Sequence, residues 1–534
     1  MDTAMTEQLD ALFAPWNRTD EPGLAVGVAR DGAVIYRRGF GMASLETAAA
    51  ITPATRMRIG STTKHFTALT ALLLAEEGKL DIDQPIRAYV PELTGPGGEP
   101  SLRQLLQHRG GSRCYLDLGF IGHGMSIPPK GRALEMQVRQ RGRNFAPGTA
   151  MLYNNGGYHL VSIAIERVGG APFAEQLKTR LFDPVGMPDT ALIESDMDIT
   201  PGIAAMHMPV REGGWRRGIF ASEEVRGEGG MVSTVDDMLR WMAHLRSRDR
   251  FGSPASWAEL TALPPFPDGS PGTYGLGLLI DSYRGLKTLH HSGGVTGGSS
   301  QMLTLPDEGL DIIIMANGAR AAEPPRLAQQ VVDIILADRV GPEVPKVKPE
   351  EYPALVADWW SPDTGMIYSL TGRDGVLYLS PAKMPGGLPV VRKADGSLAL
   401  PAGGNGETVI EPALKDGRLL VTFGGETLEH VRLTPDEADQ TAFALVAKGR
   451  YVSTDADTIA AIEEDEDGLT LSLSDGLGRT QAPLRVLSPL VAYSRPAPPM
   501  NVFRTTISLA VEGGRATGFQ LNTTRTRYLE FRRL

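Results

Sequence analysis

Ser61 and Lys64 are the residues of this chain whose types and spacing are best suited to chemistry. Gly60 suits a tight turn before them, and the apolar run 66–75 after them predicts a buried helix. Positions three apart share one helix face, so the lysine amine can reach the serine hydroxyl. Burial lowers the pKa of a lysine, and the uncharged amine can accept the serine proton. The pattern predicts a nucleophile with a built-in base. A helix-capping serine followed by a surface lysine gives the same sequence pattern and is the alternative interpretation.

Tyr153 and Asn155 form a second motif, which follows a Pro-Gly turn at 147–148. A phenol at this position can relay a proton between a nucleophile and a leaving group. The asparagine amide can hold a substrate carbonyl. Taken alone, the segment is more typical of an ordinary loop with a packed tyrosine.

A third motif runs from His291 through Ser292 and Gly293 to Gly294, before the predicted strand 300–305. Its glycines let a substrate backbone approach an edge strand closely. A phosphate-cradling loop and a histidine metal site are the rival interpretations. They are disfavoured because no Lys-Ser pair follows the glycines and the nine histidines lack ligand spacing. We therefore expect neither a cofactor nor a metal.

In this order the three motifs resemble those of the penicillin-recognising serine hydrolases, which include class C β-lactamases, D,D-peptidases, related esterases and D-aminopeptidase. The resemblance implies that Ser61 attacks a carbonyl, that Lys64 takes its proton and that Tyr153 protonates the leaving group. It also implies an oxyanion hole made by the N–H groups of Ser61 and Gly294. His291 stands where many members carry a lysine that attracts a substrate carboxylate, so a neutral imidazole weighs against a D,D-carboxypeptidase or an efficient penicillinase.

The C-terminal third reads as a pair of β domains. Asp-Gly turns at 374–375 and 467–468 each lie within alternating apolar segments, and Ala-Leu-Val-Ala occurs at 354–357 and again at 444–447. Proline-containing charged linkers precede each half. We expect an α/β (α+β) β-lactamase/penicillin-binding-protein-like catalytic domain, with an antiparallel sheet and a helical subdomain, followed by two antiparallel β-barrels. The predicted domains are 1–339, 349–433 and 441–534, a plan that most resembles D-aminopeptidase.

Substrate recognition by this resemblance involves a loop from the last domain that restricts the site to short substrates with a free amino group. The polar segment 474–481 is the candidate here, with Asp475 available to pair with an ammonium; a solvated hairpin tip is the alternative interpretation. Leu279 lies where the resemblance implies an asparagine facing the substrate amine. An aliphatic side chain cannot bind an ammonium, which favours an esterase.

The predicted function is a serine hydrolase that forms an acyl-enzyme on small amides or peptides, with D-aminopeptidase-like or D-amino-acid amidase-like activity. A carboxylesterase is the first alternative, and a non-catalytic protein that binds peptides or peptidoglycan fragments is the second. The net charge of −10 disfavours nucleic acid and an anionic membrane surface as partners. The single cysteine, Cys114, excludes an internal disulfide. The N-terminal residues predict a cytoplasmic protein, and family resemblance suggests a homodimer.

Overall fold

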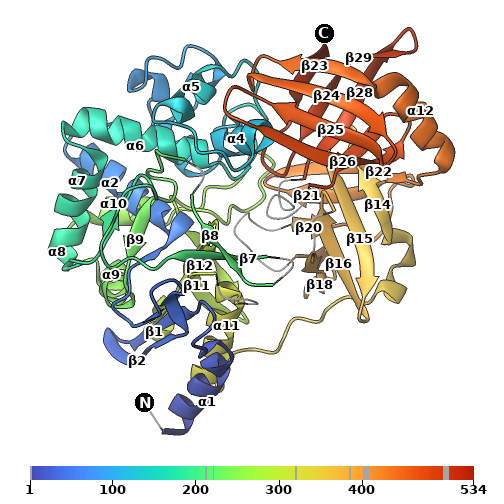
Figure 1. Ribbon diagram of the computed structural model, residues 1–534. Coiled ribbons are helices and arrows are strands. Elements are labelled where there is room, and N and C mark those ends of the chain that lie inside the picture. Colours follow the sequence, from blue (N-terminus) through green and yellow to red (C-terminus); the bar gives the residue numbers. More distant parts are fainter. Residues whose placement is uncertain are drawn as a thin grey trace.

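The computed structural model describes residues 3–210, 213–220, 222–318, 322–383, 386–400, 408–496 and 504–534. A helical layer and a central sheet built from the N-terminal two-thirds lie beside two β units built from the rest (Figure 1). No helix in these ranges is long and apolar enough to cross a membrane.

The central sheet has six antiparallel strands in the order β10-β11-β12-β13-β1-β2. The hairpin of β1 and β2 at its edge closes through Asp31 and Gly32, which have φ values of 51° and 81°. Alternate residues of β1 point to two different cores, Val26 and Val28 to one and Ala25 to the other, so both faces are covered. The strands are β1 Leu24–Arg30, β2 Ala33–Phe40, β10 Leu279–Tyr283, β11 Leu286–Val295, β12 Gly298–Leu305 and β13 Leu310–Ala316.

Two helices cover one face of this sheet, α1 (Thr3–Phe13) at the start of the N-terminal part and α11 (Pro324–Ile335) at its end. The helical layer covers the other face, and α2 is its centre. As predicted, α2 (Lys64–Glu76) is a buried helix: its residues are buried from Lys64 to Leu74. The remaining helices are α3 Leu102–Leu106, α4 Tyr115–His123, α5 Arg132–Val138, α6 Asn155–Gly169, α7 Phe173–Leu177, α8 Asp183–Val185, α9 Val235–Ser247 and α10 Pro254–Leu260.

Short strands complete the N-terminal part. The strand β5 runs directly into the Ser61 turn and pairs with β9, which also pairs with β6. Two further pairs, β3 with β4 and β7 with β8, lie outside the main sheet. These strands are β3 Met42–Ser44, β4 Ala49–Ala50, β5 Met57–Arg58, β6 Ala191–Leu192, β7 Met206–Pro209, β8 Trp215–Gly218 and β9 Met231–Ser233.

The first β unit is a nine-stranded antiparallel sheet that curls nearly into a barrel around its own apolar core. Its strand order is β17-β16-β15-β14-β22-β21-β20-β19-β18, and the predicted Asp374-Gly375 turn joins β15 to β16. The strands are β14 Ala357–Trp360, β15 Ile367–Arg373, β16 Val376–Pro381, β17 Leu388–Pro389, β18 Val391–Arg392, β19 Leu398–Ala399, β20 Thr408–Ile410, β21 Leu419–Phe423 and β22 Glu426–Leu433.

The second β unit is a closed barrel of eight antiparallel strands, β23 to β30. Together the two units confirm the predicted β-barrel plan. The strands are β23 Gly449–Ser453, β24 Thr458–Asp465, β25 Gly468–Ser474, β26 Arg479–Ser488, β27 Val491–Ser494, β28 Thr506–Glu512, β29 Arg515–Asn522 and β30 Leu529–Arg533.

One detail of the repeat prediction is wrong. The second Ala-Leu-Val-Ala ends a helix, α12 (Glu437–Ala447), whereas the first leads from a 3₁₀ turn into strand β14. Asp436 caps α12 by accepting the backbone N–H of Asp439, which explains why a helix forms in a segment with linker-like composition. The boundary predicted at 441 therefore falls inside α12, whose apolar residues pack into the barrel core.

The barrel docks on the helical layer through apolar side chains. Tyr115, Leu118 and Ile121 of α4 and Met136 of α5 belong to the same buried cluster as the barrel interior. This shared core places the loop between β29 and β30 beside Asn144 and Tyr153.

Candidate active site

Ser61 lies in a single 3₁₀ turn, η2 (Gly60–Thr63), which continues directly into α2 at Lys64. Gly60 has a φ of +52°, and a Cβ there would lie 2.9 Å from the backbone nitrogen of Gly294. Glycine is therefore required, because any side chain would separate the Ser61 turn from β11. The predicted turn and helix start are both present.

Lys64 is fully buried, and its amine contacts Ser61, Asn155 and Glu228. Its Nζ lies 3.0 Å from Ser61 Oγ, 2.8 Å from Asn155 Oδ1 and 2.6 Å from the carbonyl oxygen of Glu228. Burial lowers the pKa of Lys64 to about 7, against the opposing charge of Glu228. A substantial fraction of the amine is thus uncharged near neutral pH and able to accept a proton.

Tyr153 is buried beside this pair. Its ring centre lies 4.8 Å from Lys64 Nζ and 4.1 Å from the ring centre of His108. Burial raises the pKa of Tyr153, while the Ser61 side chain lowers it more weakly, so the phenol keeps its proton. His108 was missed in the sequence; its Nδ1 accepts the backbone N–H of Asn154 over 3.1 Å and so fixes the segment that carries Tyr153.

Asn155 opens α6, which Asn154 caps by accepting the N–H of Gly156 over 2.7 Å. The sequence predicted that the Asn155 amide holds a substrate carbonyl. In the structure its oxygen is occupied by Lys64, so its observed contact orients the lysine.

The strand β11 closes the other side of the nucleophile turn. Thr62 donates to the carbonyl oxygen of His291 over 3.2 Å, and Ser300 donates to that of Ile59 over 2.8 Å. A Cβ on Gly293 would lie 1.8 Å from the Ile59 oxygen, which explains this glycine. At Gly294, by contrast, a Cβ would meet nothing within 4 Å, so the backbone there faces open space next to Ser61.

The hydrogen bonds of His291 define its tautomer. Nδ1 lies 2.6 Å from the carbonyl oxygen of Ser292, which can only accept, so Nδ1 carries the proton. Nε2 then accepts the hydroxyl of Tyr274 over 3.0 Å. Burial holds the pKa of His291 well below its usual value, with Lys64 adding to the effect. The imidazole is buried and neutral, so it contributes no positive charge to the site.

Tyr153 is part of an apolar wall of the site. The wall consists of five buried side chains: Met151, Tyr153, Phe266, Tyr274 and Leu279. Leu279 starts β10 and pairs with His290 of β11, and its side chain offers no polar group. The inference that Leu279 favours an esterase stays a prediction.

Asp475 does not reach this site. Its carboxylate lies 2.7 Å from His123 Nδ1 in α4, both side chains being almost completely buried, and it also accepts the backbone N–H groups of Leu477 and Gly478. The hydrogen bond with His123 lowers the pKa of Asp475, although burial opposes it. The prediction that Asp475 pairs with a substrate ammonium fails because the 474–481 turn docks on α4 instead.

A different turn of the same barrel enters the site, the β29–β30 loop at 523–528. The guanidinium of Arg525 lies 4.9 Å from the Tyr153 ring centre. Arg525 was not predicted from the sequence; the signal that could have indicated it is a short run of threonines and arginines before the last apolar segment.

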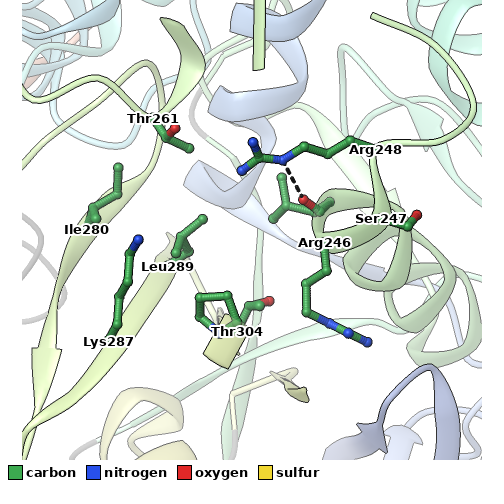
Figure 2. Close-up of a pocket in the computed structure, with 10 residues that line it drawn as sticks. Arg246, Ser247, Arg248, Thr261, Ile280, Lys287, Leu289 and Thr304 are labelled. Carbon is green, nitrogen blue, oxygen red and sulfur yellow. Dashed lines mark hydrogen bonds between the residues drawn. The ribbon is translucent and has the colours of Figure 1, made fainter. Parts of the chain in front are cut away.

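A separate hollow of about 360 Å³ lies at the opposite end of β11 and β12 from Gly294 (Figure 2). Its lining includes Arg248, whose Nε donates to the carbonyl oxygen of Leu245, and Lys287. Neither Ser61 nor Lys64 nor Tyr153 lines this hollow, so it is not the catalytic site.

Comparison with known proteins shows the family of this chain. Residues 4–336 match the Beta-lactamase family model, and the chain belongs to that family. It is a serine hydrolase with a β-lactamase/penicillin-binding-protein-like fold, as the motifs predicted. The fold is shared with the octameric penicillin-binding protein homologue from Pyrococcus abyssi (TM-score 0.57, 22% identity, 80% of this chain and 100% of that one). It is also shared with the D-amino acid amidase from Ochrobactrum anthropi (TM-score 0.52, 23% identity, 63% and 100%).

Curated relatives are more similar in sequence. A D-aminopeptidase from Gluconobacter oxydans is 30% identical over 390 residues, which is 71% of each chain. A D-aminopeptidase from Brucella canis is 29% identical over 372 residues. The alignment spans 66% of the length of the Brucella relative, so its activity enters only as a proposal.

Proposed function

We propose that the protein hydrolyses small amides or peptides through an acyl-enzyme on Ser61, with D-aminopeptidase-like or D-amino-acid amidase-like activity. The observation that carries this proposal is the buried Lys64, whose Nζ lies 3.0 Å from Ser61 Oγ. The relatives called D-aminopeptidase support the substrate class.

In the first step the uncharged Lys64 amine takes the Ser61 proton while Oγ forms a bond to the substrate carbonyl carbon. The N–H groups of Ser61 and Gly294 donate hydrogen bonds to the carbonyl oxygen and stabilise its negative charge. Losing one such donor costs about 3 kcal/mol in the transition state. Because Tyr153 remains protonated, it can give its proton to the leaving nitrogen as the C–N bond breaks, and Lys64 returns the proton to it. Water then cleaves the ester bond and restores the Ser61 hydroxyl.

The activity is tested with the p-nitroanilides of D-alanine, L-alanine and N-acetyl-D-alanine, beside p-nitrophenyl acetate and nitrocefin. Preferred hydrolysis of the free-amine D-alanine compound is the expected result. Turnover of the acetate ester alone would replace the proposal with a carboxylesterase, the alternative that buried Leu279 favours. Absence of any turnover or labelling would leave the peptide-binding alternative.

Glu228→Gln is expected to extend activity to lower pH. The Glu228 carboxylate raises the pKa of Lys64, and the reaction needs Lys64 uncharged, so removing that charge lowers the pH at which activity is lost. The measurement is the acid limb of kcat/KM against pH. Glu223→Gln, in the same segment, is the matched control, and an unmoved acid limb in Glu228→Gln would contradict the assignment of that limb to Lys64.

Homodimerisation and a cytoplasmic location stay predictions. Light scattering on the purified protein tests the first, and cell fractionation of the full-length gene product tests the second.

A further inference from the structure

The β29–β30 loop is anchored on both sides of Arg525. Thr523 and Thr526 donate their hydroxyls to the buried carboxylate of Asp117 in α4. Asn144 Nδ2 donates to the carbonyl oxygen of Arg525 over 3.1 Å, and Asn144 Oδ1 accepts a backbone N–H two residues further on. These contacts fix the backbone, so the Arg525 side chain is presented to the site from a defined position.

The guanidinium of Arg525 makes no hydrogen bond or ion pair with any residue in the ranges that the structure describes; its contact is with the Tyr153 ring. Nearby arginines differ. Arg527 lies 2.7 Å from Glu426, and Arg113 lies 2.7 Å from Asp455. The five N–H donors of Arg525 are therefore available to a ligand.

Arg525 is also a permanent positive charge in a site whose other basic groups are largely neutral. Burial lowers the pKa of Lys64, and it lowers the pKa values of His108 and His291 well below the usual value. A guanidinium stays charged across the working pH range. The barrel thus brings a cation to a site in which β11 offers only a neutral imidazole.

We propose that Arg525 binds a carboxylate on the leaving group, so that the protein prefers dipeptides with a free C-terminal carboxylate to their neutral amides. This inference rests on the proposed function, because Tyr153, over whose ring Arg525 lies, is the residue that serves the leaving group. The planar guanidinium can meet a carboxylate through two parallel N–H···O bonds. Because Arg525 would bind the terminal carboxylate of a dipeptide, a longer peptide would gain no further charged contact at this position.

Asp117 is the acidic residue that most directly competes for Arg525. Its Oδ2 already accepts two threonine hydroxyls, and burial raises its pKa more than Arg525 lowers it. No ion pair joins the two side chains within the described ranges. Asp117 therefore anchors the loop and leaves the guanidinium to a ligand.

The test compares D-alanyl-glycine with D-alanyl-glycinamide, which differ only at the terminal carboxylate. The wild-type protein is expected to favour the free acid about 10- to 100-fold in kcat/KM, the usual effect of a hydrogen-bonded charge. Arg525→Gln is expected to bring that ratio to within about threefold of one, because it loses the charged interaction. Arg525→Lys should keep part of the preference, since it retains the charge without the planar fork.

The ratio of kcat/KM for the acid to kcat/KM for the amide separates carboxylate binding from general damage to the active site, because such damage would lower both values together. Arg515→Gln, an identical substitution on an exposed turn of the same barrel, should keep the wild-type ratio. The proposal is overturned if the wild-type protein shows no preference for the acid or if Arg525→Gln preserves it.

A second readout separates this proposal from the proposed function. Each dipeptide is tested for protection of Ser61 against a fluorophosphonate, which reports occupancy without turnover. The acid should protect at a lower concentration than the amide in the wild type, and both should protect equally in Arg525→Gln. If this difference holds without hydrolysis, the carboxylate site stands and the proposed function fails. If D-alanine p-nitroanilide is hydrolysed but both ligands protect equally, the carboxylate site fails alone.

Discussion

Ser61→Ala is expected to reduce hydrolysis by about 10⁴-fold or more, because it removes the only atom placed to form the acyl-enzyme. Ser61 Oγ lies against Lys64 Nζ at the start of α2, and no other hydroxyl is within hydrogen-bonding distance of that amine in the part of the chain that the structure describes. The expected measurement is kcat/KM on the best anilide substrate, together with intact mass after treatment with a fluorophosphonate.

The variant should fold normally, since Ser61 is only half-buried and loses one oxygen. Ser282→Ala, on the exposed face of β10, is the matched control and should retain both activity and labelling. Hydrolysis by folded Ser61→Ala protein at more than a hundredth of the wild-type rate would exclude the acyl-enzyme on this residue.

Lys64→Met is the second large effect, an expected loss of about 10²- to 10⁴-fold in kcat/KM, the range for removal of a general base. Methionine fills the buried space of the lysine side chain but cannot accept the Ser61 proton. In the wild type, activity should rise with pH through about 7, the pKa to which burial lowers that of Lys64, because only the uncharged amine is a base. This limb should be missing in the variant.

Lys79→Met supplies the control, since Lys79 is exposed near the end of the same helical region and pairs with Glu77. It should behave as the wild type. Thermal unfolding of both variants shows whether the loss of the lysine donor to the oxygens of Asn155 and Glu228 destabilises the protein. A Lys64→Met protein that is folded and keeps the wild-type pH profile would assign the base to another group.

Ser61 and Lys64 could be predicted from the sequence because their relation is local. A glycine turn followed by an apolar helix fixes which side chains share a face, whatever the rest of the chain does. The glycines of β11 could be read for a different reason: the residue type itself indicates a close approach, and a Cβ at Gly293 would lie 1.8 Å from the carbonyl oxygen of Ile59. The order of the three motifs supplied the family, and the fold followed from it.

The residues that support the site could not be predicted from the sequence. Nothing near His108 in the sequence indicates that its ring packs on Tyr153, and the carbonyl oxygen of Glu228 meets Lys64 only through folding. Such contacts join positions that are distant in the chain, and a backbone carbonyl leaves no trace in residue type.

The barrel shows most clearly what only the tertiary structure decided. Its alternating strands and polar turns predicted a β unit, and both 474–481 and 523–528 are polar turns of that unit. Which turn enters the active site depends on the face that packs against α4 and α5, through a shared apolar core. That packing buries Asp475 against His123 and brings Arg525 to Tyr153. Alternation along a strand shows which side chains point inward, but docking depends on the three-dimensional shape of two surfaces, which no local pattern contains.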